Sequence, residues 1–341
     1  MKKINYIGVL TVISILLLTS CGENKKGTRT DTLTSGIADI AVDECLAPII
    51  EEEIMVFEAL NREASIIPSY TNDYQVYDLL MKDSMRLIIG TRELTDKEVA
   101  VIKERQQRVR SQKIAIDGIA LITNKANPDT LLSIKDLKNI MTGEMRNWKD
   151  INPESKLGNI AVAFDSPNSS TVRYIKDSIC GDKPIGDNVR AISPDSRTIN
   201  IEESSPNQKV IEYVASNPNA LGIIGVNWIS NPGDTTNLSF IDKINVVSVS
   251  REDKATRANS FKPYPYQLAM ELAYRMSAES EQKGGYPLTR DVYIIITDSS
   301  GGLPSGFVNF VAGDRGQRII LKAGLLPANR PVRLVRITDS M

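Results

Sequence analysis

Short apolar runs and helical patterns alternate along this chain of 341 residues, and the alternation constrains its fold more than any other feature. Runs rich in branched residues predict strands, and segments with apolar residues at helical spacing follow them. The first predicted elements are a strand over 37–42, a helix over 46–60 and a strand over 64–69. Strands that alternate with helices predict a mainly parallel sheet with helices on both faces, so the expected fold class is α/β.

The alternation continues toward the end of the chain. The next predicted elements are a helix over 73–82, a strand over 87–90, a helix that opens with the capping box Thr95 to Glu98, and a strand over 114–122. Further strands are predicted over 160–164, 221–226 and 292–297, and further helices over 171–179, from Ser205-Pro206 to Ala215, over 306–312 and over 314–323. With 41% hydrophobic residues, the chain can form two lobes of ordinary size.

Residues 117–151 hold the most informative local pattern. The apolar run 119–122 predicts a buried strand, and Asn127-Pro128 then breaks it. Ser133 and Asp136 form an acidic variant of the capping box at the start of a short helix that Gly143 ends. This order of an Asp-Gly strand, an Asn-Pro loop and a Thr-Gly-x-x-x-x-Trp helix end resembles the PstS-like phosphate-binding proteins of ABC importers, in the type II periplasmic solute-binding superfamily.

The resemblance extends over nearly all of the chain after residue 36, and residues 286–290, read as Tyr-Pro-Leu-Thr-Arg, add to it. It implies a two-lobed periplasmic-binding-protein fold of type II with a hinge between the lobes. One hinge segment is expected near residues 116–117 and the other between 226 and 293. Lobe I would comprise 37–116 and 290–336, and lobe II would comprise 117–289. The sequence assigns no role to residues 250–283.

Residues 1–20 have the pattern of a bacterial lipoprotein signal peptide. Lys2 and Lys3 precede an apolar segment over 7–18, and small residues lead to Cys21. We expect cleavage before Cys21, acylation at this residue, and a lipid anchor on the extracytoplasmic side of a bacterial membrane. An ordinary secretory signal with a chance cysteine is the alternative. Residues 21–36 are polar, so we expect a tether, with the folded part beginning near Ile37.

Charge and composition exclude several function classes. Removal of Lys2 and Lys3 leaves 39 of the 41 basic residues against 42 acidic ones, so there is no global basic field to hold nucleic acid. A basic cluster over 103–113 is expected on the helix that opens at Thr95, where a solvated face is favoured over a partner patch. The chain has no His, which removes the Ser-His-Asp triad and the usual zinc ligand sets. Composition leaves carboxylate-only catalysis open, as in glycosidases, but no pair of acids can be placed across a cleft from the sequence. We expect neither enzyme activity nor a metal or cofactor.

The three cysteines limit which disulfide bonds the chain can form. Acylation commits Cys21, which leaves Cys45 and Cys180 as the only possible disulfide pair. Nothing in the sequence places these two residues near each other, so both are expected to be free.

Four loops that lead from a predicted strand into a helix form the candidate ligand site. In open α/β sheets, ligands bind beyond the carboxyl ends of the strands, where helix N-termini offer free N–H groups to an anion. The most persuasive loop ends in three hydroxyl residues beside a helix start, although plain N-capping is the alternative. Together the loops supply the candidate binding residues Asp43, Glu44, Asn72, Thr91, Arg92, Ser169, Ser170 and Thr171.

The resemblance both supports this site and departs from it. Phosphate binders of the family carry Ser-Gly-Thr at the corresponding helix start, preceded four residues earlier by an Arg that pairs with the anion. Residues 169–171 match except for Ser170, but Asp165 stands at the Arg position, and Asp43 and Glu44 stand where small hydroxyl residues are usual. A carboxylate can accept one hydrogen bond from a protonated phosphate oxygen, yet several acids facing an anion cost free energy.

Positive charge must therefore come from elsewhere. Arg92 is the leading candidate and Arg173, one turn into the helix, is the second. The resemblance implies a monomeric solute-binding lipoprotein that captures phosphate, or a related small solute, between its lobes and passes it to an ABC permease. The acidic substitutions leave an alternative, in which an envelope lipoprotein of the same fold binds a non-phosphate ligand or acts in sensing or scaffolding.

Overall fold

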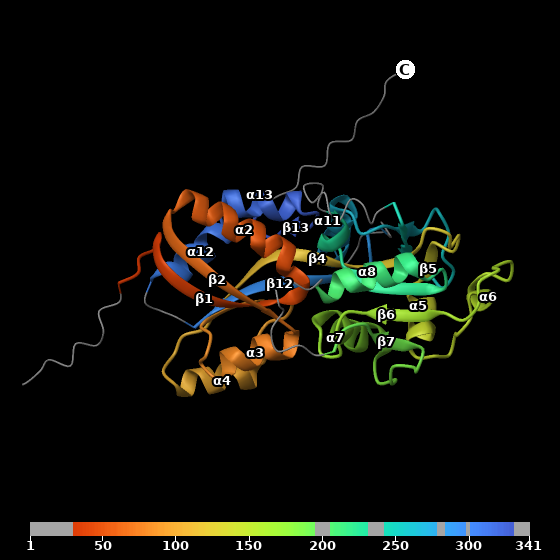
Figure 1. Ribbon diagram of the computed structural model, residues 1–341, viewed down its shortest axis with the longest axis horizontal. Coiled ribbons are helices and arrows are strands. Elements are labelled where there is room, and N and C mark those ends of the chain that lie inside the picture. The colour runs from red at the N-terminus through yellow and green to blue at the C-terminus, as the bar shows by residue number, and fades with distance from the viewer. Residues whose placement is uncertain (1–29, 195–204, 231–241, 278–283, 298–300, 331–341) are drawn as a thin grey trace, which may run out of the picture.

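A computed structural model describes residues 30–194, 205–230, 242–277, 284–297 and 301–330. These residues form two lobes that lie side by side along the long axis of the molecule (Figure 1). Each lobe has a sheet between layers of helices, so the predicted α/β class and two-lobed architecture are confirmed.

The first lobe contains strands β2 (Glu63–Thr71), β1 (Ser35–Asp43), β3 (Leu87–Gly90), β12 (Thr289–Ile296) and the first half of β4 (Arg110–Asn124), in that spatial order. One face packs against α2 (Ala47–Leu60), α12 (Leu303–Ala312) and α13 (Asp314–Lys322), and the other against α3 (Asp73–Met81) and α4 (Asp96–Glu104). Leu87 and Ile89 join the first core and Ile88 joins the second, because successive side chains of a strand point to opposite faces.

The second lobe continues the sheet through β8 (Ala220–Gly225), β6 (Ala161–Phe164) and β7 (Val189–Ala191), with β9 (Ile244–Val246) beside β4. On one face lies α8 (Pro206–Ser216), which buries Val210, Ile211 and Val214. The other face carries α5 (Ile134–Met141), α7 (Ser170–Ile175) and the π-helical turn η2 (Lys176–Cys180). Short elements complete the lobe: β5 (Leu131–Ser133), α6 (Trp148–Ile151), α9 (Asn227–Ser230), β10 (Ser248–Ser250) and β11 (Ser260–Phe261).

Strand β4 runs through both lobes. The first half of β4 pairs with β12 and with β13 (Leu326–Pro327), and its second half pairs with β8 and β9. These pairings are all antiparallel, whereas β1 with β2 and β6 with β8 are parallel. The predicted mainly parallel sheet is therefore wrong at the junction, because strands that cross between lobes are not joined to their neighbours by the βαβ connections that make strands parallel.

Helix ends follow the predicted signals. The capping boxes of Thr95 with Glu98 and of Ser133 with Asp136 are both present, and Gly143 has the positive φ of 74° expected after a helix. The basic cluster over 103–113 is placed wrongly by the sequence analysis. Helix α4 ends at Glu104 and β4 begins at Arg110, so the cluster runs from a helix end through a loop into a strand.

The folded part begins earlier than predicted. The backbone N–H of Leu303 donates to Asp31 Oδ2 at 2.7 Å, which ties the segment before β1 to the start of α12. A Cβ at Gly306 would lie 1.8 Å from the carbonyl oxygen of Leu33, so only glycine permits this close approach. The predicted start near Ile37 is several residues too late. No helix within the described ranges has the length and apolar character needed to cross a membrane.

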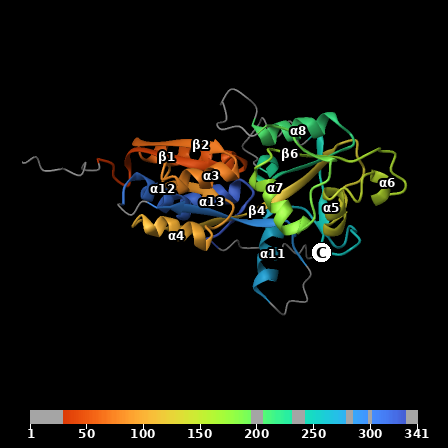
Figure 2. The same ribbon diagram turned by 90° about the horizontal axis from the view of Figure 1, so that it is seen from below.

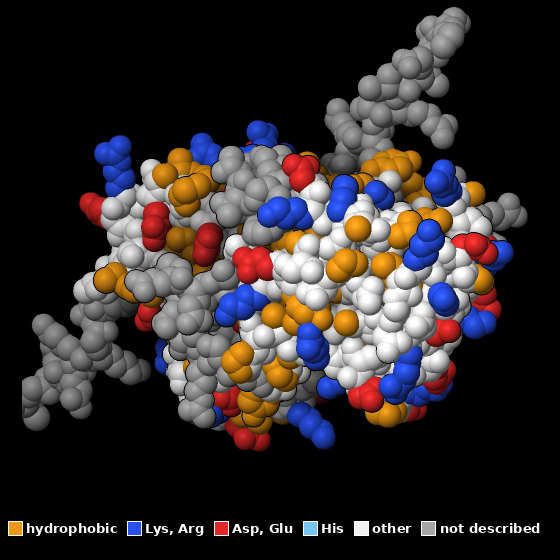
Figure 3. All heavy atoms as spheres, turned by 45° about the vertical axis from the view of Figure 1, so that its right-hand side comes forward, with side chains coloured by type: hydrophobic (Ala, Val, Ile, Leu, Met, Phe, Trp, Pro, Cys, Tyr) orange, Lys and Arg blue, Asp and Glu red, His pale blue; other side chains and the backbone are white. Residues whose placement is uncertain are grey.

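Residues 250–277 include α11 (Pro265–Met276), which projects from the second lobe in Figure 2. Its Leu268 is buried in the core of that lobe, while Tyr266 and Met276 are exposed. Figure 3 shows that acidic and basic side chains are interspersed on the face displayed. Cys45 and Cys180 are both free and buried, as expected.

Candidate functional site

The four predicted loops meet between the two lobes. Three lie at the carboxyl ends of β1, β2 and β3 in the first lobe, and the fourth follows β6 in the second. Ser166 Oγ donates to Glu44 Oε1 at 2.8 Å, and Cys45 Sγ lies 3.3 Å from Ser170 Oγ, so the loops touch across the junction. The predicted residues are buried except for half-buried Arg92: Asp43, Glu44, Asn72, Thr91, Ser169, Ser170 and Thr171.

The hydroxyl residues at the start of α7 already have partners within the protein. Ser169 is the N-cap and accepts from the backbone N–H of Val172 at 3.2 Å. Thr171 Oγ1 donates to Asp165 Oδ2 at 3.4 Å. Asn72 likewise caps α3, accepting from Gln75 N at 3.0 Å. Capping is thus part of the role of Ser169 and Asn72, and a ligand contact by these residues stays a prediction.

Two buried carboxylates of the site, Asp43 and Asp165, each retain an oxygen without a hydrogen-bond partner among the described residues. Asp43 Oδ1 accepts from the N–H of Cys45 at 3.0 Å, but Asp43 Oδ2 has no partner. Asp165 Oδ1 has none either, and both side chains are fully buried. Burial raises the pKa of Asp165 to about 6, and the negative charge of Asp43 contributes to the rise. The site can therefore accept hydrogen bonds from a ligand that carries protons.

Sequence reasoning missed the cation at the centre of the site, Arg290. This residue of β12 is 5% exposed, and its Nε and Nη2 atoms each lie 2.9 Å from Asp117 Oδ2. Its Nη1 donates to Ser170 Oγ at 2.9 Å, and its Nη2 lies 3.0 Å from Cys45 Sγ. Arg290 thus contacts both lobes and the crossing strand β4. The available signal is its place in the Tyr-Pro-Leu-Thr-Arg strand, from which the resemblance implies only a part of the fold.

The other two guanidiniums differ from what the sequence suggested. Arg92 Nη1 and Nη2 each donate to Glu98 at 2.8 Å, and the guanidinium lies 3.6 Å from the ring centroid of Tyr77. Burial acts to raise the pKa of Glu98, but hydrogen bonds from Arg92 and Thr95 outweigh this effect and lower the pKa to about 2. The charge of Arg92 is therefore balanced within its own lobe.

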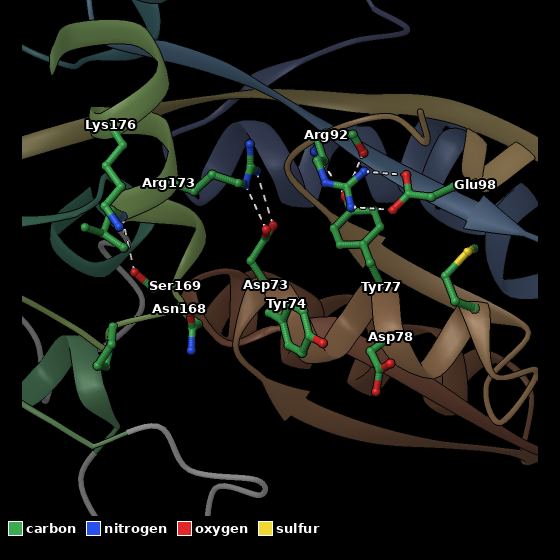
Figure 4. A pocket seen from close by; sticks show the side chains of 13 residues that line it. Asp73, Tyr74, Tyr77, Asp78, Arg92, Glu98, Asn168, Ser169, Arg173 and Lys176 are labelled. Atoms are coloured by element: carbon green, nitrogen blue, oxygen red, sulfur yellow. Dashed lines mark hydrogen bonds and ion pairs between the residues drawn. The ribbon is translucent and has the colours of Figure 1, made fainter. Parts of the chain in front are cut away.

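Arg173 instead reaches from α7 across to the first lobe. It donates to both oxygens of Asp73, at 2.8 and 3.2 Å (Figure 4). It also donates to Thr91 Oγ1 at 2.9 Å. A cavity of about 500 Å³ opens beside this contact. Its walls come from both lobes and include Asp73, Tyr74, Tyr77, Arg92, Glu98, Ser169, Arg173 and Lys176. This arrangement places Arg173 closer to the predicted binding hydroxyls than Arg92.

Comparisons with known proteins agree with this fold. The PBP superfamily domain matches residues 27–315. The phosphate-binding protein PstS of Staphylococcus epidermidis is 23% identical over 327 residues, which cover 93% of this chain and 87% of that protein. PstS of Staphylococcus aureus is 22% identical over 328 residues, with 93% and 86% covered.

Solved structures show the same architecture. A protein of Clostridium perfringens named as a phosphate ABC transporter substrate-binding protein, with bound phosphate, has a TM-score of 0.63 and 21% identity, covering 86% of this chain and 100% of that one. An ABC-type phosphate transport receptor of Vibrio cholerae has a TM-score of 0.57 and 18% identity, covering 85% and 99%. The family match over most of the chain, together with the two-lobed fold, shows that this protein belongs to the PBP superfamily.

Proposed function

We propose that the protein is an extracytoplasmic solute-binding protein that captures phosphate between its lobes and delivers it to an ABC importer. The observation that carries the proposal is the meeting of four strand-to-helix loops at the lobe junction, where the guanidinium of Arg173 reaches Thr91 and that of Arg290 holds Ser170 in place. Arg pairs with planar and tetrahedral oxyanions through two parallel hydrogen bonds. The PstS relatives over 93% of the chain support the same ligand class.

The acidic groups of the site favour a protonated form of phosphate. Asp43 Oδ2 and Asp165 Oδ1 are buried acceptors without partners in the described residues, and a phosphate hydroxyl is a donor that fits them. Because the pKa of Asp165 is raised to about 6, this group is itself partly protonated in mildly acidic solution. We therefore expect phosphate to bind more tightly at pH 6 than at pH 8.

The test is thermal unfolding of the protein without its lipid signal, in the presence of phosphate, sulfate, molybdate or organic phosphates. Binding to the folded state alone stabilises it by about 2.7 kcal/mol when the ligand is at 100 times its Kd. Phosphate should therefore raise the melting temperature, and calorimetry should give the Kd. Absence of both heat and stabilisation at millimolar phosphate would contradict the proposal.

A second candidate function follows from the charge balance of the site. Among the described residues of the site, one buried guanidinium, that of Arg290, faces the buried carboxylates of Asp43, Glu44, Asp117 and Asp165. A negative excess favours a neutral or cationic ligand. If phosphate does not stabilise the protein but a neutral or cationic ligand does, the protein would be an envelope protein with another transport, sensing or scaffolding role.

The division of the chain is part of the proposal. We infer that 37–116 with 290–336 form lobe I, together with the described residues just before 37, and that 117–289 form lobe II, with closure about the segments where β4 and β12 cross. Residues 195–204, 231–241, 278–283, 298–300 and 331–336 of these ranges lie outside the described part of the chain. The separate hydrophobic cores on either side of the crossing support this division. We also propose that the protein has no enzyme activity and acts as a monomer. Sedimentation of the form without its lipid signal would check the monomeric state.

A lipid anchor at Cys21 completes the proposal, although residues 1–29 lie outside the described part of the chain. Acylation requires the Cys21 thiol, so Cys21→Ala should abolish metabolic labelling with a fatty acid and leave the signal uncleaved. Because two or more acyl chains anchor stably, the native protein should stay with membranes in a salt wash. Equal fatty-acid label on both proteins would refute the anchor.

A further inference from the structure

An ion pair bridges the two lobes at the edge of the candidate site. Asp73 is the first residue of α3 in the first lobe, and Arg173 lies on α7 in the second. The Asp73 side chain is 6% exposed and that of Arg173 is 30% exposed. The contact is therefore largely shielded from water, and it links the same two lobes between which the ligand is proposed to bind.

The contact has the geometry with which a guanidinium holds an oxyanion. Nε and Nη2 of Arg173 donate to the two oxygens of Asp73, and Nη2 also donates to Thr91 Oγ1. Such a paired arrangement suits two oxygens of a carboxylate or two oxygens of a phosphate equally. Ser169 and Thr91, both proposed ligand contacts, lie beside it. The Asp73 carboxylate thus occupies the donors that a bound anion would use.

The Asp73 carboxylate is not needed as the cap of its own helix. Asn72 is the N-cap of α3, and its Oδ1 accepts from Gln75 N at 3.0 Å. Both Asp73 oxygens are directed to Arg173 on the other lobe, as Figure 4 shows. A role in the contact between lobes therefore accounts for this side chain better than a role in starting the helix.

We propose that Asp73 is an internal competitor of the ligand, whose carboxylate occupies Arg173 in the empty protein and is displaced when an anion binds. The inference rests on the proposed function. It makes Asp73 a specificity-determining residue, because an incoming anion must interact with Arg173 and Thr91 better than a carboxylate does. Phosphate, with more charge and more acceptor oxygens, meets this demand, whereas a monocarboxylate such as acetate does not.

Calorimetry with inorganic phosphate on the soluble chain tests the inference. Asp73→Asn removes the competing charge, so phosphate should bind at least about fivefold more tightly than to wild type, within the usual range of coupling between sites. Asp96→Asn is the matched control. Asp96 is likewise the first residue of a helix in the first lobe, α4, but it is exposed and is not among the residues that line the cavity, so its loss removes one charge without releasing Arg173. Its Kd should change by less than about twofold, because exposed charges are screened.

The reactivity of the Cys45 thiol is a second measurement on the same variants. Cys45 is fully buried at the lobe junction, where its Sγ lies 3.3 Å from Ser170 Oγ. Its reaction with a thiol reagent, mapped by mass spectrometry to separate it from Cys180, reports opening of the lobes. In Asp73→Asn, protection of Cys45 should reach its midpoint at a lower phosphate concentration than in wild type. Sodium acetate should protect neither protein.

The alternative outcome is that the pair acts only as a latch that favours closure. Asp73→Asn would then bind phosphate more weakly and expose Cys45 faster in the absence of ligand, and this result overturns the inference. An unchanged Kd in Asp73→Asn overturns it too. Asp73→Ser repeats the measurement if Asp73→Asn melts at a lower temperature. Failure of every protein, wild type included, to bind millimolar phosphate overturns the proposed function and the inference with it.

Discussion

The two walls of the cleft carry different chemistry. The first lobe contributes the carboxylates of Asp43, Glu44 and Asp73, alongside Thr91 and the paired guanidinium of Arg92. The second contributes the hydroxyl groups at the start of α7 and the guanidinium of Arg173, with Asp165 as its acidic exception. Groups on one wall are satisfied by groups on the other, as in the bond from Ser166 to Glu44 and the pair of Arg173 with Asp73. A ligand that binds between the lobes would therefore replace contacts between them rather than fill empty donors.

Between the walls, Arg290 belongs to neither lobe alone. Its guanidinium joins Asp117 of the crossing strand β4, Cys45 of the first lobe and Ser170 of the second. Burial raises the pKa of Asp117, and the charge of Arg290 opposes that rise. The comparison thus separates a structural cation, Arg290, from cations at the cleft edge, and the following predictions test that separation.

The largest effect is expected from Arg290→Ala. The substitution leaves the buried carboxylate of Asp117 without its partner, so the free energy of unfolding should fall by about 3–5 kcal/mol. Urea denaturation measures this loss, and Arg290→Lys should lose less because it keeps the charge. A loss below about 1 kcal/mol for Arg290→Ala would show that Asp117 is protonated or solvated and that Arg290 is no structural centre.

A smaller effect separates the two cations near the cleft edge. Arg173→Ala should weaken phosphate binding by roughly 1.5–3 kcal/mol, the value of a hydrogen bond to a charged group. The sequence favours Arg92 for this role, but Arg92 is paired with Glu98, so Arg92→Ala should weaken binding by less than about 1 kcal/mol. Calorimetry on both variants decides the order. A larger loss in Arg92→Ala would return the main role to that residue.

The acids of the cleft should make the ligand-free protein less stable as the pH rises. The pKa of Asp165 is about 6 in the folded protein against an ordinary value of 3.8, so the folded state binds the proton more tightly than the unfolded state. Stability is then lost as the pH increases from near 4 through about 6. In thermal unfolding, the melting temperature of Asp165→Asn should fall less steeply over this pH interval than that of the wild type. Identical pH profiles for the two proteins would mean that Asp165 does not titrate in this range.

The smallest effect on stability concerns the helix start in the second lobe. Ser169→Ala removes the N-cap of α7 and should lower the free energy of unfolding by about 1 kcal/mol. If Ser169 and Thr171 also bind the ligand, the double variant Ser169→Ala with Thr171→Ala should lose stabilisation by phosphate altogether. Melting with and without phosphate measures both quantities. A variant that melts several degrees lower yet keeps its full response to phosphate would leave capping as the role of this loop.

Local signals in the sequence were enough to predict most elements. Ser133 with Asp136 and Thr95 with Glu98 form the predicted capping boxes, and Gly143 ends its helix as expected. These features depend on residues three or four positions apart, so the chain specifies them without help from the rest of the fold. The α/β class follows from the same kind of information. Apolar residues recur at strand spacing and then at helical spacing along the chain, and this spacing shows which face of each element is buried.

Strand direction at the junction could not be predicted in this way. β12 lies about 170 positions after β4 in the chain, yet Arg290 pairs with Asp117 in their antiparallel register. No local pattern encodes a pairing between segments so far apart. Arg290 lies in the site because of this register, so the sequence alone did not indicate its role there.

The sequence by itself determined the helix caps, the order of the elements and the set of loops that meet between the lobes. Only the tertiary structure decided which charges pair: Arg92 with Glu98 within one lobe, Arg173 with Asp73 across the cleft, and Arg290 with Asp117 at the hinge. The physical reason is that an ion pair depends on distance and burial, which are set by residues remote in sequence, whereas a cap or an apolar period is set by neighbours along the chain.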